Sequence, residues 1–573
     1  MTVNKKDVVR LLETIAIYME LKGENPFKIS AFRKAANALE QDDRSLSAIE
    51  DFTKLGGIGK GTAAVIQEYL DTGRSDALEA LQKEVPEGLL PLLKLPGLGG
   101  KKIAKLYKEL GVDSMEALKE ACLKHQIQGL QGFGKKTEEK ILEAIDESGT
   151  RPDRLPLAFM LPISEEIDSF LKNAEGITRF SKAGSLRRMR ETIKDLDYII
   201  SCENPQAVRE QLLKMPKLTD VIASGDTKVS VQLGYDFEVN VDFRLVQDAE
   251  FASALHHFTG SKDHNVKMRQ LAKERGEKIS EYGIENLETG EVKTVSDEAE
   301  LYAHFGLPWI PPELREDGTE VDKAEMTDTL IKLEDIKGDL HMHSTWTDGA
   351  FTIEEMAEAC RAKGYRYMAI TDHSKYLKVA GGLTEERLRA QREEVNRLNS
   401  KYSNFTILAG VEMDILPDGT LDYDDQMLEE LDFVIASIHS SFSQPEDVIM
   451  SRLKTALESH HVDLIAHPTG RLIGKRKGYE PDVDLLIKLA KETNTALELN
   501  ANPNRLDLSA ENIRKAQAAG VKIMINTDAH SLDMLEHMPI GVSAAKKGWI
   551  EKENVINTWE LDELRQFLNR HSS

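Results

Sequence analysis

The chain has 573 residues, of which 40% are hydrophobic and 30% are charged. This composition excludes a disordered or membrane-embedded protein, and the length exceeds what one hydrophobic core usually serves, so we expect several globular domains. The net charge of −24 argues against a basic surface over the whole molecule, but it is compatible with local basic faces that bind nucleic acid.

The cysteines and the lengths of the apolar stretches indicate the cellular compartment of the protein. The three cysteines, Cys122, Cys202 and Cys360, are an odd number and lie far apart, which suits a reducing compartment and predicts no disulfide framework. No stretch stays apolar over the roughly 18 residues that a membrane span needs. We therefore expect a cytoplasmic protein without membrane contacts.

Residues 1 to about 150 are predicted to be almost entirely helical. Apolar residues recur at helical spacing over residues 5–22 and again over residues 29–39. Three cations lie in or beside the second of these helices, namely Lys28, Arg33 and Lys34. Such a cationic face is usually just solvated, and the alternative is that it contacts phosphates.

Three short repeats follow, at residues 55–60, 95–102 and 130–136. Each has the pattern apolar-x-Gly-apolar-Gly with a cation after it, and each precedes an amphipathic helix. Two glycines let the backbone turn tightly and expose N–H groups to a nucleic-acid phosphate. The repeats resemble helix-hairpin-helix motifs, and three copies favour DNA-backbone binding over ordinary glycine-rich connections. The predicted DNA contacts are Gly57, Gly59, Lys60, Gly97, Gly99, Lys101, Gly132, Gly134 and Lys135, together with Lys28, Arg33 and Lys34.

The next informative stretch runs from Gly184-Ser185 to Asp195-Leu196-Asp197. A small polar turn can open its N–H groups to a phosphate, and Arg188 lies beside it. An extended backbone sends both carboxylates of Asp195 and Asp197 to one face, where they suit Mg²⁺. The alternative is a surface turn whose arginines pair with nearby acids.

A third carboxylate favours the metal site. Residues 237–245 alternate polar and apolar side chains with a period of two, so Asp242 can lie on a neighbouring strand beside the first two aspartates. Three such carboxylates can hold two divalent ions, the arrangement that stabilises attacking and leaving oxygens in phosphoryl transfer. The sequence therefore favours nucleotidyl transfer.

These residues resemble the family X DNA polymerases, whose best-known member is DNA polymerase beta. The resemblance implies that Asp195, Asp197 and Asp242 are catalytic and hold Mg²⁺ or Mn²⁺. It also implies a nucleotide-binding turn and a following helix at residues 258–269. The nucleotide-binding residues implied are Gly184, Ser185, Arg188, Phe258, Gly260, Ser261, Asn265 and Arg269.

Two positions depart from that family. His257 replaces the tyrosine that usually precedes Phe258, which puts discrimination against ribonucleotides in doubt. Some relatives also use a Schiff-base lysine in the helix after the first hairpin for a deoxyribose-phosphate lyase. Val65 occupies the matching position, and its side chain cannot form an imine, so we expect no lyase by that route.

From about residue 336 the pattern changes to apolar strands that alternate with helices, which predicts parallel strands closed like a barrel. Seven strands are expected, at residues 339–343, 367–371, 405–412, 432–437, 462–466, 495–500 and 521–527. Histidines and acids follow most of these strands, at the end where barrel enzymes build their sites. The nine candidate ligands are His341, His343, Asp348, His373, Glu412, His439, His467, Asp528 and His530.

Imidazoles and carboxylates without a thiolate suit two or three ions of Zn²⁺, Mn²⁺ or Fe²⁺, and such ions promote phosphoester hydrolysis. These residues resemble a PHP (polymerase and histidinol phosphatase) domain with all of its usual ligand positions filled. The resemblance implies metal-dependent 3′-to-5′ exonuclease activity, with 3′-phosphatase and abasic-site endonuclease activity as further options. After His467, a cationic loop is either a phosphate grip or simply solvated; its cations are Arg471, Lys475, Arg476 and Lys477.

Taken together, the two resemblances predict a multidomain enzyme. Its expected parts are a helical DNA-binding domain (1–85), fingers with helix-hairpin-helix motifs (86–150), an α+β nucleotidyltransferase palm (151–250), a thumb (251–315), an acidic linker (316–335) and a distorted (βα)7 PHP barrel (336–573).

The predicted function is short-gap filling in DNA repair, including base excision repair, with trimming of 3′ ends. The expected partners are gapped or primed DNA and deoxynucleoside triphosphates, bound by a monomer. Two alternatives remain: a DNA-binding nuclease whose polymerase half is inactive, and a hydrolase of a small phosphate ester such as histidinol phosphate.

Overall fold

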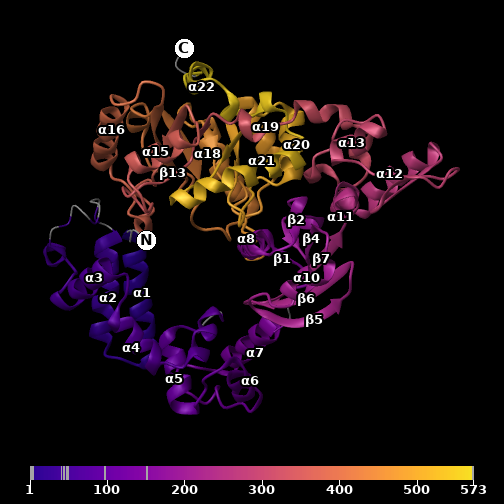
Figure 1. Cartoon of the computed structure of the whole chain (residues 1–573). Helices are drawn as coiled ribbons and strands as arrows, with labels where there is room; N and C mark the ends of the chain where they lie inside the picture. The colour runs from indigo at the N-terminus through magenta and orange to yellow at the C-terminus, as the bar shows by residue number, and fades with distance from the viewer. Residues whose placement is uncertain are drawn as a thin grey trace. The chain divides into compact units, whose positions relative to one another are not determined.

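The computed structural model describes residues 5–40, 42, 46, 49, 51–95, 98–149 and 152–570. Up to residue 149 the described residues form helices and connections without strands, as predicted (Figure 1). The predicted DNA contact Gly97 lies outside the described residues. The helices are α1 (Lys5–Lys22), α2 (Pro26–Glu40), η2 (Phe52–Lys54), α3 (Lys60–Thr72), α4 (Asp76–Glu84), η3 (Glu87–Leu89), η4 (Pro91–Lys94), α5 (Gly100–Leu110), α6 (Met115–Leu123) and α7 (Lys135–Gly149).

Two hydrophobic clusters hold this helical region together. One gathers buried residues of α1, α2 and α3, among them Leu12, Leu39 and Ile66. The other gathers residues from α1 onward to α7, among them Ile15 and Ile103. The helix α1 contributes to both clusters because its apolar residues cover more than one face.

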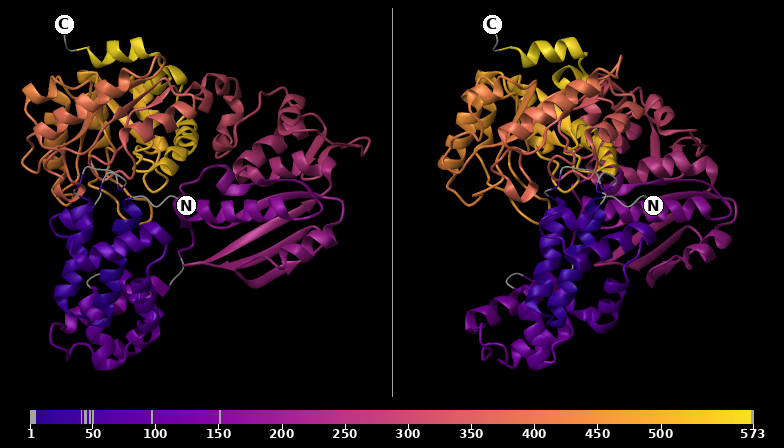
Figure 2. Two further views of the ribbon diagram at one scale, coloured as in Figure 1. Left: turned by 60° about the vertical axis from the view of Figure 1, so that its left-hand side comes forward. Right: turned by 90° about the vertical axis from the view of Figure 1, so that its left-hand side faces the viewer.

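The region predicted to be the palm contains a five-stranded sheet with the order β2-β4-β7-β6-β5. The pair β4 and β7 is parallel and the other pairs are antiparallel, which confirms a mainly antiparallel sheet (Figure 2). Its strands are β2 (Ile177–Lys182), β4 (Leu196–Cys202), β5 (Leu218–Ser224), β6 (Lys228–Gly234) and β7 (Glu238–Val246). A small pair, β1 (Leu155–Pro156) with β3 (Thr192–Ile193), and the helices α8 (Leu157–Asn173), α9 (Gly184–Arg187) and α10 (Pro205–Leu212) complete it.

The strand β7 explains why the palm has a functional face. Its buried residues alternate with partly exposed ones, so Val241 and Phe243 enter the core while Asn240, Asp242 and Arg244 line the opposite face. Burying the apolar face fixes the register of the strand. The same register therefore fixes where Asp242 lies.

The thumb follows the palm and contains helices and a small antiparallel sheet. Its elements are η5 (Asp248–Glu250), α11 (Phe251–Thr259), α12 (Lys262–Glu274), β8 (Glu277–Ser280), β9 (Gly283–Asn286), β10 (Val292–Lys293) and α13 (Glu298–His304). Met268, Leu301 and Tyr302 lie in its hydrophobic cluster.

The stretch predicted as an acidic linker is more ordered than that prediction implies. It contains α14 (Thr319–Asp322), η7 (Ala324–Thr329) and η8 (Leu333–Asp335), after η6 (Pro312–Leu314). Val321, Ala324 and Leu330 are buried in the hydrophobic cluster of the thumb. These three residues hold the segment in place, although its overall composition is acidic.

The C-terminal region is a seven-stranded parallel sheet in simple chain order, as predicted. An isolated parallel bridge between Met342 and Ala529 brings its two edges together, so the sheet is a nearly closed barrel. The strands are β11 (Gly338–Asp339), β12 (Tyr367–Ile370), β13 (Thr406–Asp414), β14 (Phe433–Ser437), β15 (Leu464–Ile465), β16 (Ala496–Asn500) and β17 (Ile523–Asn526).

Helices follow most of these strands. They are α15 (Ile353–Ala362), η9 (Lys378–Ala380), α16 (Glu385–Asn399), α17 (Asp425–Leu428), α18 (Glu446–Glu458), α19 (Val483–Thr493), α20 (Ala510–Ala519), η10 (Leu532–His537), α21 (Met538–Lys547), η11 (Lys552–Asn554), η12 (Ile556–Thr558) and α22 (Leu561–Leu568). Strand residues such as Ala369, Leu408 and Ile435 are fully or almost fully buried, which explains their near-continuous apolar runs.

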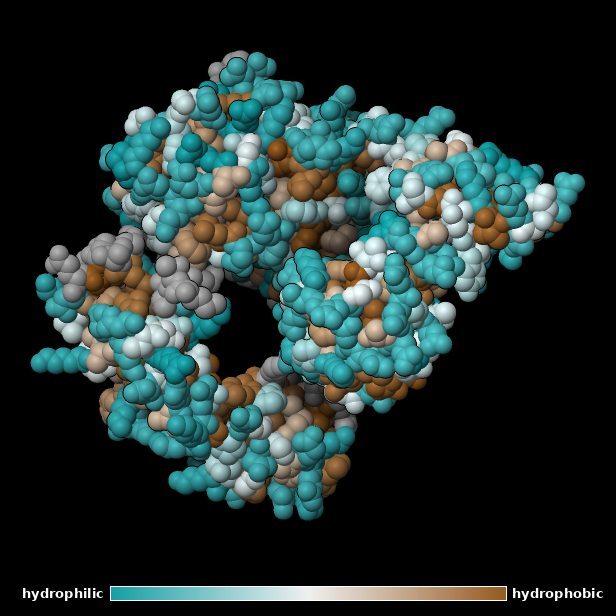
Figure 3. Space-filling model, viewed as in Figure 1, coloured by the Kyte–Doolittle hydropathy of each residue, from teal (hydrophilic) through white to brown (hydrophobic). Residues whose placement is uncertain are grey.

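The surface agrees with the composition. Hydrophilic residues predominate on the face drawn in Figure 3. Among the described residues, no helix is both long enough and apolar enough to cross a bilayer. Cys122, Cys202 and Cys360 are all buried and free.

A buried ion network ties the thumb to the palm. Glu298 accepts from Arg315 Nη1 at 2.5 Å and from Arg187 Nη2 at 2.7 Å. Burial alone would raise the pKa of the Glu298 carboxyl, but Arg315 and then Arg187 outweigh burial and hold that pKa well below its usual range. One carboxylate therefore neutralises two guanidinium groups from different parts of the chain.

Replacing that carboxylate should destabilise the fold. We expect Glu298→Gln to lower the free energy of unfolding by about 3 kcal/mol at neutral pH, because it leaves buried cations uncompensated. Since the folded-state pKa is depressed, the deficit should shrink as the pH falls below the ordinary glutamate value of 4.5. Urea titration measures the deficit, with the exposed Glu288→Gln as control. Equal stability of the two variants at neutral pH would contradict the assigned role.

Candidate active sites

The palm brings its three predicted carboxylates to one place. Asp197 on β4 lies directly opposite Asp242 on the parallel strand β7, and Asp195 immediately precedes β4. Burial, and then the neighbouring charges of Asp242 and Asp195, raise the pKa of Asp197 to about 7. Carboxylates that resist ionising together are a donor set that fits divalent cations such as Mg²⁺ or Mn²⁺.

Polar neighbours that the sequence analysis missed support these aspartates. Ser230 Oγ donates to Asp242 Oδ1 at 2.6 Å, and Lys228 Nζ lies 2.7 Å from Asp242 Oδ2. Asn240 Nδ2 donates to Asp195 Oδ1 at 3.3 Å. Ser230 and Lys228 belong to β6, which pairs with β7, so only the strand order could have revealed them.

The predicted phosphate turn packs directly on the carboxylates. Gly184 begins the short helix α9 with a φ of +56°, and a Cβ at this position would lie 2.0 Å from Asp197 Oδ2. Only glycine fits there, because of both the close approach and the left-handed backbone. Ser185 follows on the same turn, so the turn and the face that carries the three carboxylates are adjacent.

The two arginines of that turn have different environments. Arg187 is committed to Glu298 and also donates to Thr259 Oγ1 at 2.8 Å. Arg188 donates from Nη1 to the Thr259 carbonyl at 2.8 Å, and its Nε lies 3.3 Å from Glu316. Arg188 therefore links the turn to the end of α11, where the second predicted nucleotide-binding segment begins.

In that second segment, several predicted nucleotide contacts also hold the local backbone. Ser261 Oγ accepts from the His264 N–H at 3.1 Å and caps α12. Asn265 Nδ2 donates to the His257 carbonyl at 2.8 Å, while a Cβ on Gly260 would lie 2.6 Å from the His264 ring. The half-buried Phe258 stacks with Arg244, whose guanidinium lies 4.6 Å from the ring centroid. Arg269 is exposed on α12.

The hairpin repeats have the glycine geometry that their pattern predicts. Gly57 and Gly132 have φ values of +109° and +92°. Gly59 and Gly99 are the N-cap residues of α3 and α5, and Gly134 directly precedes α7. An exposed lysine lies at or next to the first residue of each helix, namely Lys60, Lys101 and Lys135.

The other predicted DNA contacts are cations of α2, and two of them lie next to acidic residues. Arg33 Nη2 lies 2.6 Å from Glu20, and Lys28 Nζ lies 3.5 Å from Glu24. Lys34 is exposed beside them. Local acids therefore offset part of the positive charge on this helix.

The C-terminal barrel assembles all nine predicted ligands at the carboxyl ends of its strands. Three groups have ligand atoms within 4.8 Å of one another. The first is His343, Asp348, His373 and His530, the second is His341, His343 and Asp528, and the third is His373, Glu412 and His439. His467 joins them because its Nε2 lies 2.9 Å from Glu412 Oε1. This mix of buried imidazoles and carboxylates is consistent with bound metal ions.

Glu412 lies at the centre of this set. His373 Nδ1 is 3.0 Å from its Oε2, and His439 Nε2 is 3.2 Å from its Oε1. Burial alone would raise the pKa of Glu412, but the surrounding histidines, His439 foremost, outweigh burial and hold it well below its usual value. The carboxylate is therefore kept ionised.

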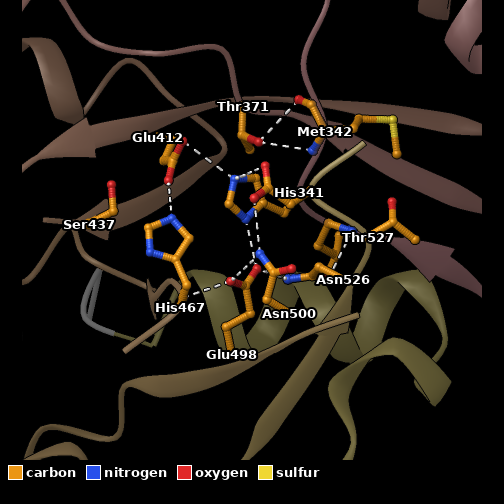
Figure 4. A network of polar contacts seen from close by, with 12 residues as sticks. His341, Met342, Thr371, Glu412, Ser437, His467, Glu498, Asn500, Asn526 and Thr527 are labelled. Carbon is orange, nitrogen blue, oxygen red and sulfur yellow. Dashed lines mark hydrogen bonds and ion pairs between the residues drawn. The ribbon is translucent and has the colours of Figure 1, made fainter. Parts of the chain in front are cut away.

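Glu498 is a functional residue that the sequence analysis missed. Figure 4 shows its carboxylate between His341 and His467. His341 Nδ1 lies 2.7 Å from Glu498 Oε1, and the His467 N–H donates to Oε2 at 2.7 Å. A carboxylate behind a ligating histidine fixes its ring and raises its basicity. The available signal was a pair of polar residues, Glu498 and Asn500, inside an otherwise apolar strand.

Asp414 plays the same part for another ligand. It is fully buried at the end of β13, and His439 Nδ1 lies 3.2 Å from its Oδ1. On the opposite side of the barrel, Asn500 Nδ2 donates to Asp528 Oδ2 at 3.0 Å. Further buried polar residues, namely Glu498, Asp414 and Asn500, therefore contact the candidate ligands and fix their positions.

Comparison with known proteins covers almost the whole chain. Residues 3–75 match a helix-hairpin-helix domain, residues 89–147 a SAM-like helix-hairpin-helix tandem, residues 254–316 the DNA polymerase beta thumb, and residues 339–502 the PHP domain. The DNA polymerase/3′-5′ exonuclease PolX of Bacillus subtilis (strain 168) is 66% identical over 568 residues, covering 99% of this chain and 100% of that relative. The chain belongs to the family X DNA polymerases with a C-terminal PHP domain.

Two more distant relatives each match part of this family X chain. A probable phosphatase of Thermoanaerobacter sp. (strain X514) is 29% identical over 241 residues, which are 40% of this chain and 93% of that protein. DNA polymerase lambda of Rattus norvegicus is 24% identical over 335 residues, 54% of this chain and 56% of that protein.

The contact between Gly184 and Asp197 should be critical for nucleotide incorporation by this family X chain. We expect Gly184→Ala to lower kcat about 100-fold, because the added methyl displaces a carboxylate that must be precisely positioned. Primer extension measures this effect, with Gly225→Ala as control, since a Cβ on Gly225 meets nothing closer than 3.6 Å. Extension by Gly184→Ala at the control's rate would show that the turn tolerates the methyl group.

Proposed function

We propose that this chain fills short gaps during DNA repair, including base excision repair, and trims 3′ ends with its PHP domain. The observation that carries the proposal is the pairing of Asp197 with Asp242 across β4 and β7, in a chain that also assembles a separate nine-residue ligand set. Its 66% identity to a DNA polymerase/3′-5′ exonuclease supports both halves.

In the proposed synthesis reaction, Asp195, Asp197 and Asp242 hold Mg²⁺ or Mn²⁺. The bound ions would neutralise the charge that develops on the phosphates and the primer hydroxyl. Ser185 and Arg188 bind the triphosphate, and the segment from Phe258 to Arg269 binds the rest of the nucleotide. The hairpin glycines and lysines grip the DNA backbone without reading its sequence.

In the proposed nuclease reaction, the nine PHP residues hold two or three ions. These ions would supply an activated water to a phosphodiester. Glu412 contacts several histidines. Glu498 and Asp414 contact the Nδ1 atoms of His341 and His439 and so fix the two rings, with each Nε2 atom facing Glu412. Both sites are built from one chain, so we expect a monomer that acts in the cytoplasm, where its proposed substrates are found.

The two reactions should be separable by mutation. We expect Asp242→Ala to abolish extension of a gapped primer and spare shortening, and His341→Ala to do the reverse. The assay uses a labelled primer with Mn²⁺, with and without nucleotides. Asp220→Ala and His460→Ala, both exposed, are matched controls.

Three results would contradict the proposal. Loss of both activities in either variant would contradict two independent centres. Shortening without any extension by the wild type would favour the DNA-binding nuclease with an inactive polymerase half. Rapid hydrolysis of histidinol phosphate without action on DNA would favour the small-ester hydrolase.

A second activity of the PHP site is also proposed, because a probable phosphatase is 29% identical to this chain over 241 residues, which are 93% of that protein. We expect release of phosphate from a DNA strand with a 3′-phosphate and cleavage at abasic sites, both lost in His341→Ala. Phosphate release and gel mobility measure the two reactions. Retention of either reaction in His341→Ala would assign it elsewhere.

A further inference from the structure

We infer that Arg505 and Arg476 form a clamp for the phosphates of the DNA strand end that enters the PHP site. The inference rests on the proposed nuclease function and assigns its substrate-binding residues. Arg505 lies on the connection after β16, and Arg476 lies on the connection after β15, the strand that precedes His467. Both positions belong to the end of the barrel that carries the candidate ligands.

Arg505 is a cation at the edge of the ligand set. Its Nε lies 3.8 Å from Asp528 Oδ2, which is longer than a hydrogen bond, and its side chain is 21% exposed. Within the part of the chain that the structure describes, its guanidinium donates no hydrogen bond to a protein acceptor, so its donors are available to an incoming oxyanion.

The backbone at Arg505 is nevertheless fixed. Its N–H donates to the Asn502 carbonyl at 2.7 Å, and its carbonyl accepts from Arg471 Nε at 3.0 Å. Arg471 also donates to the Leu506 carbonyl. Arg471, one of the cations in the predicted phosphate grip, therefore acts as a support for Arg505.

Arg476 is exposed and yet held in place. Its guanidinium stacks on Phe442, 4.3 Å from the ring centroid, and its Nε donates to the Gly470 carbonyl at 3.2 Å. Phe442 stacks in turn on Tyr479, with ring centroids 5.5 Å apart and planes 21° apart. The Tyr479 hydroxyl donates to the carbonyl of His467 at 3.2 Å, which connects this stack to a candidate ligand.

The loop around Arg476 is shaped for this stack. Gly470 has a φ of +62°, and a Cβ there would lie 2.5 Å from the Tyr479 ring and 2.9 Å from the Phe442 ring. Arg476 also exchanges backbone hydrogen bonds of 2.8 Å in both directions with Leu472. The guanidinium is therefore oriented before a substrate binds, which reduces the entropy lost on binding.

The two arginines act on one another. Partial burial of the guanidinium, and then the positive charge of Arg505, lower the pKa of Arg476 from its ordinary value. Two like charges that face one region cost free energy unless an anion binds between them. A planar guanidinium matches a phosphate with two parallel donors, so the chemistry fits a phosphodiester strand that lies across the mouth of the barrel.

The test measures shortening of a single-stranded 3′ end by the full chain over a range of salt concentrations. We expect Arg505→Gln and Arg476→Gln each to raise KM about tenfold and to reduce the slope of log KM against log salt by about 0.7, the value for one lost contact to a single strand. Arg505→Lys should show a smaller rise in KM than Arg505→Gln, because lysine keeps the positive charge but lacks the two parallel donors of a guanidinium. DNA synthesis should stay at the wild-type rate.

Arg397→Gln is the matched control, since Arg397 is exposed near the end of α16 that leads into the start of β13. A second readout needs no metal: in EDTA, a strand with a photoreactive 3′-terminal base should crosslink to residues 439–444 and 469–479, with lower yield in both test variants. Wild-type KM, salt slope and crosslinking in both variants would overturn the clamp alone. Absence of shortening by the wild type would overturn the clamp together with the proposed nuclease.

Discussion

Carboxylates that lie close together repel one another, and both candidate active sites are built around buried carboxylates. In the palm, the register of β4 and β7 puts Asp197 opposite Asp242, and burial followed by the charges of Asp242 and Asp195 raises the pKa of Asp197. In the barrel, the histidines around Glu412 offset its charge. The rigid parallel strands under both sites keep these groups together, so the sites are ready for cations.

The two sites solve the problem of charge in different ways. In the palm, few polar groups contact the carboxylates, chiefly Ser230 and Lys228 beside Asp242. Most of the negative charge would therefore be neutralised by metal ions that bind together with a triphosphate. The barrel surrounds its acids with imidazoles that are themselves held by Glu498 and Asp414. The first arrangement suits a metal that arrives with its nucleotide, and the second suits ions that stay bound.

Much of this architecture could be predicted from the sequence, because short-range patterns specify it. The period of two in β7 predicted the position of Asp242, and apolar runs followed by histidines predicted the barrel and its ligands. Glu498 escaped prediction since its partner His341 is 157 positions away, so only the folded barrel brings them together. The stretch at 316–335 was misjudged because three apolar residues, Val321, Ala324 and Leu330, outweigh its acidic composition.

The position of Glu412 has a consequence for how the barrel takes up metal. The Glu412 carboxylate contacts histidines that follow three different strands. A metal ion bound by one group of these histidines would therefore also orient donors of the neighbouring group. Uptake should then be cooperative, with a binding curve steeper than that of independent sites. Partly filled barrels would then be scarce, and nuclease activity would rise steeply above a threshold concentration of metal.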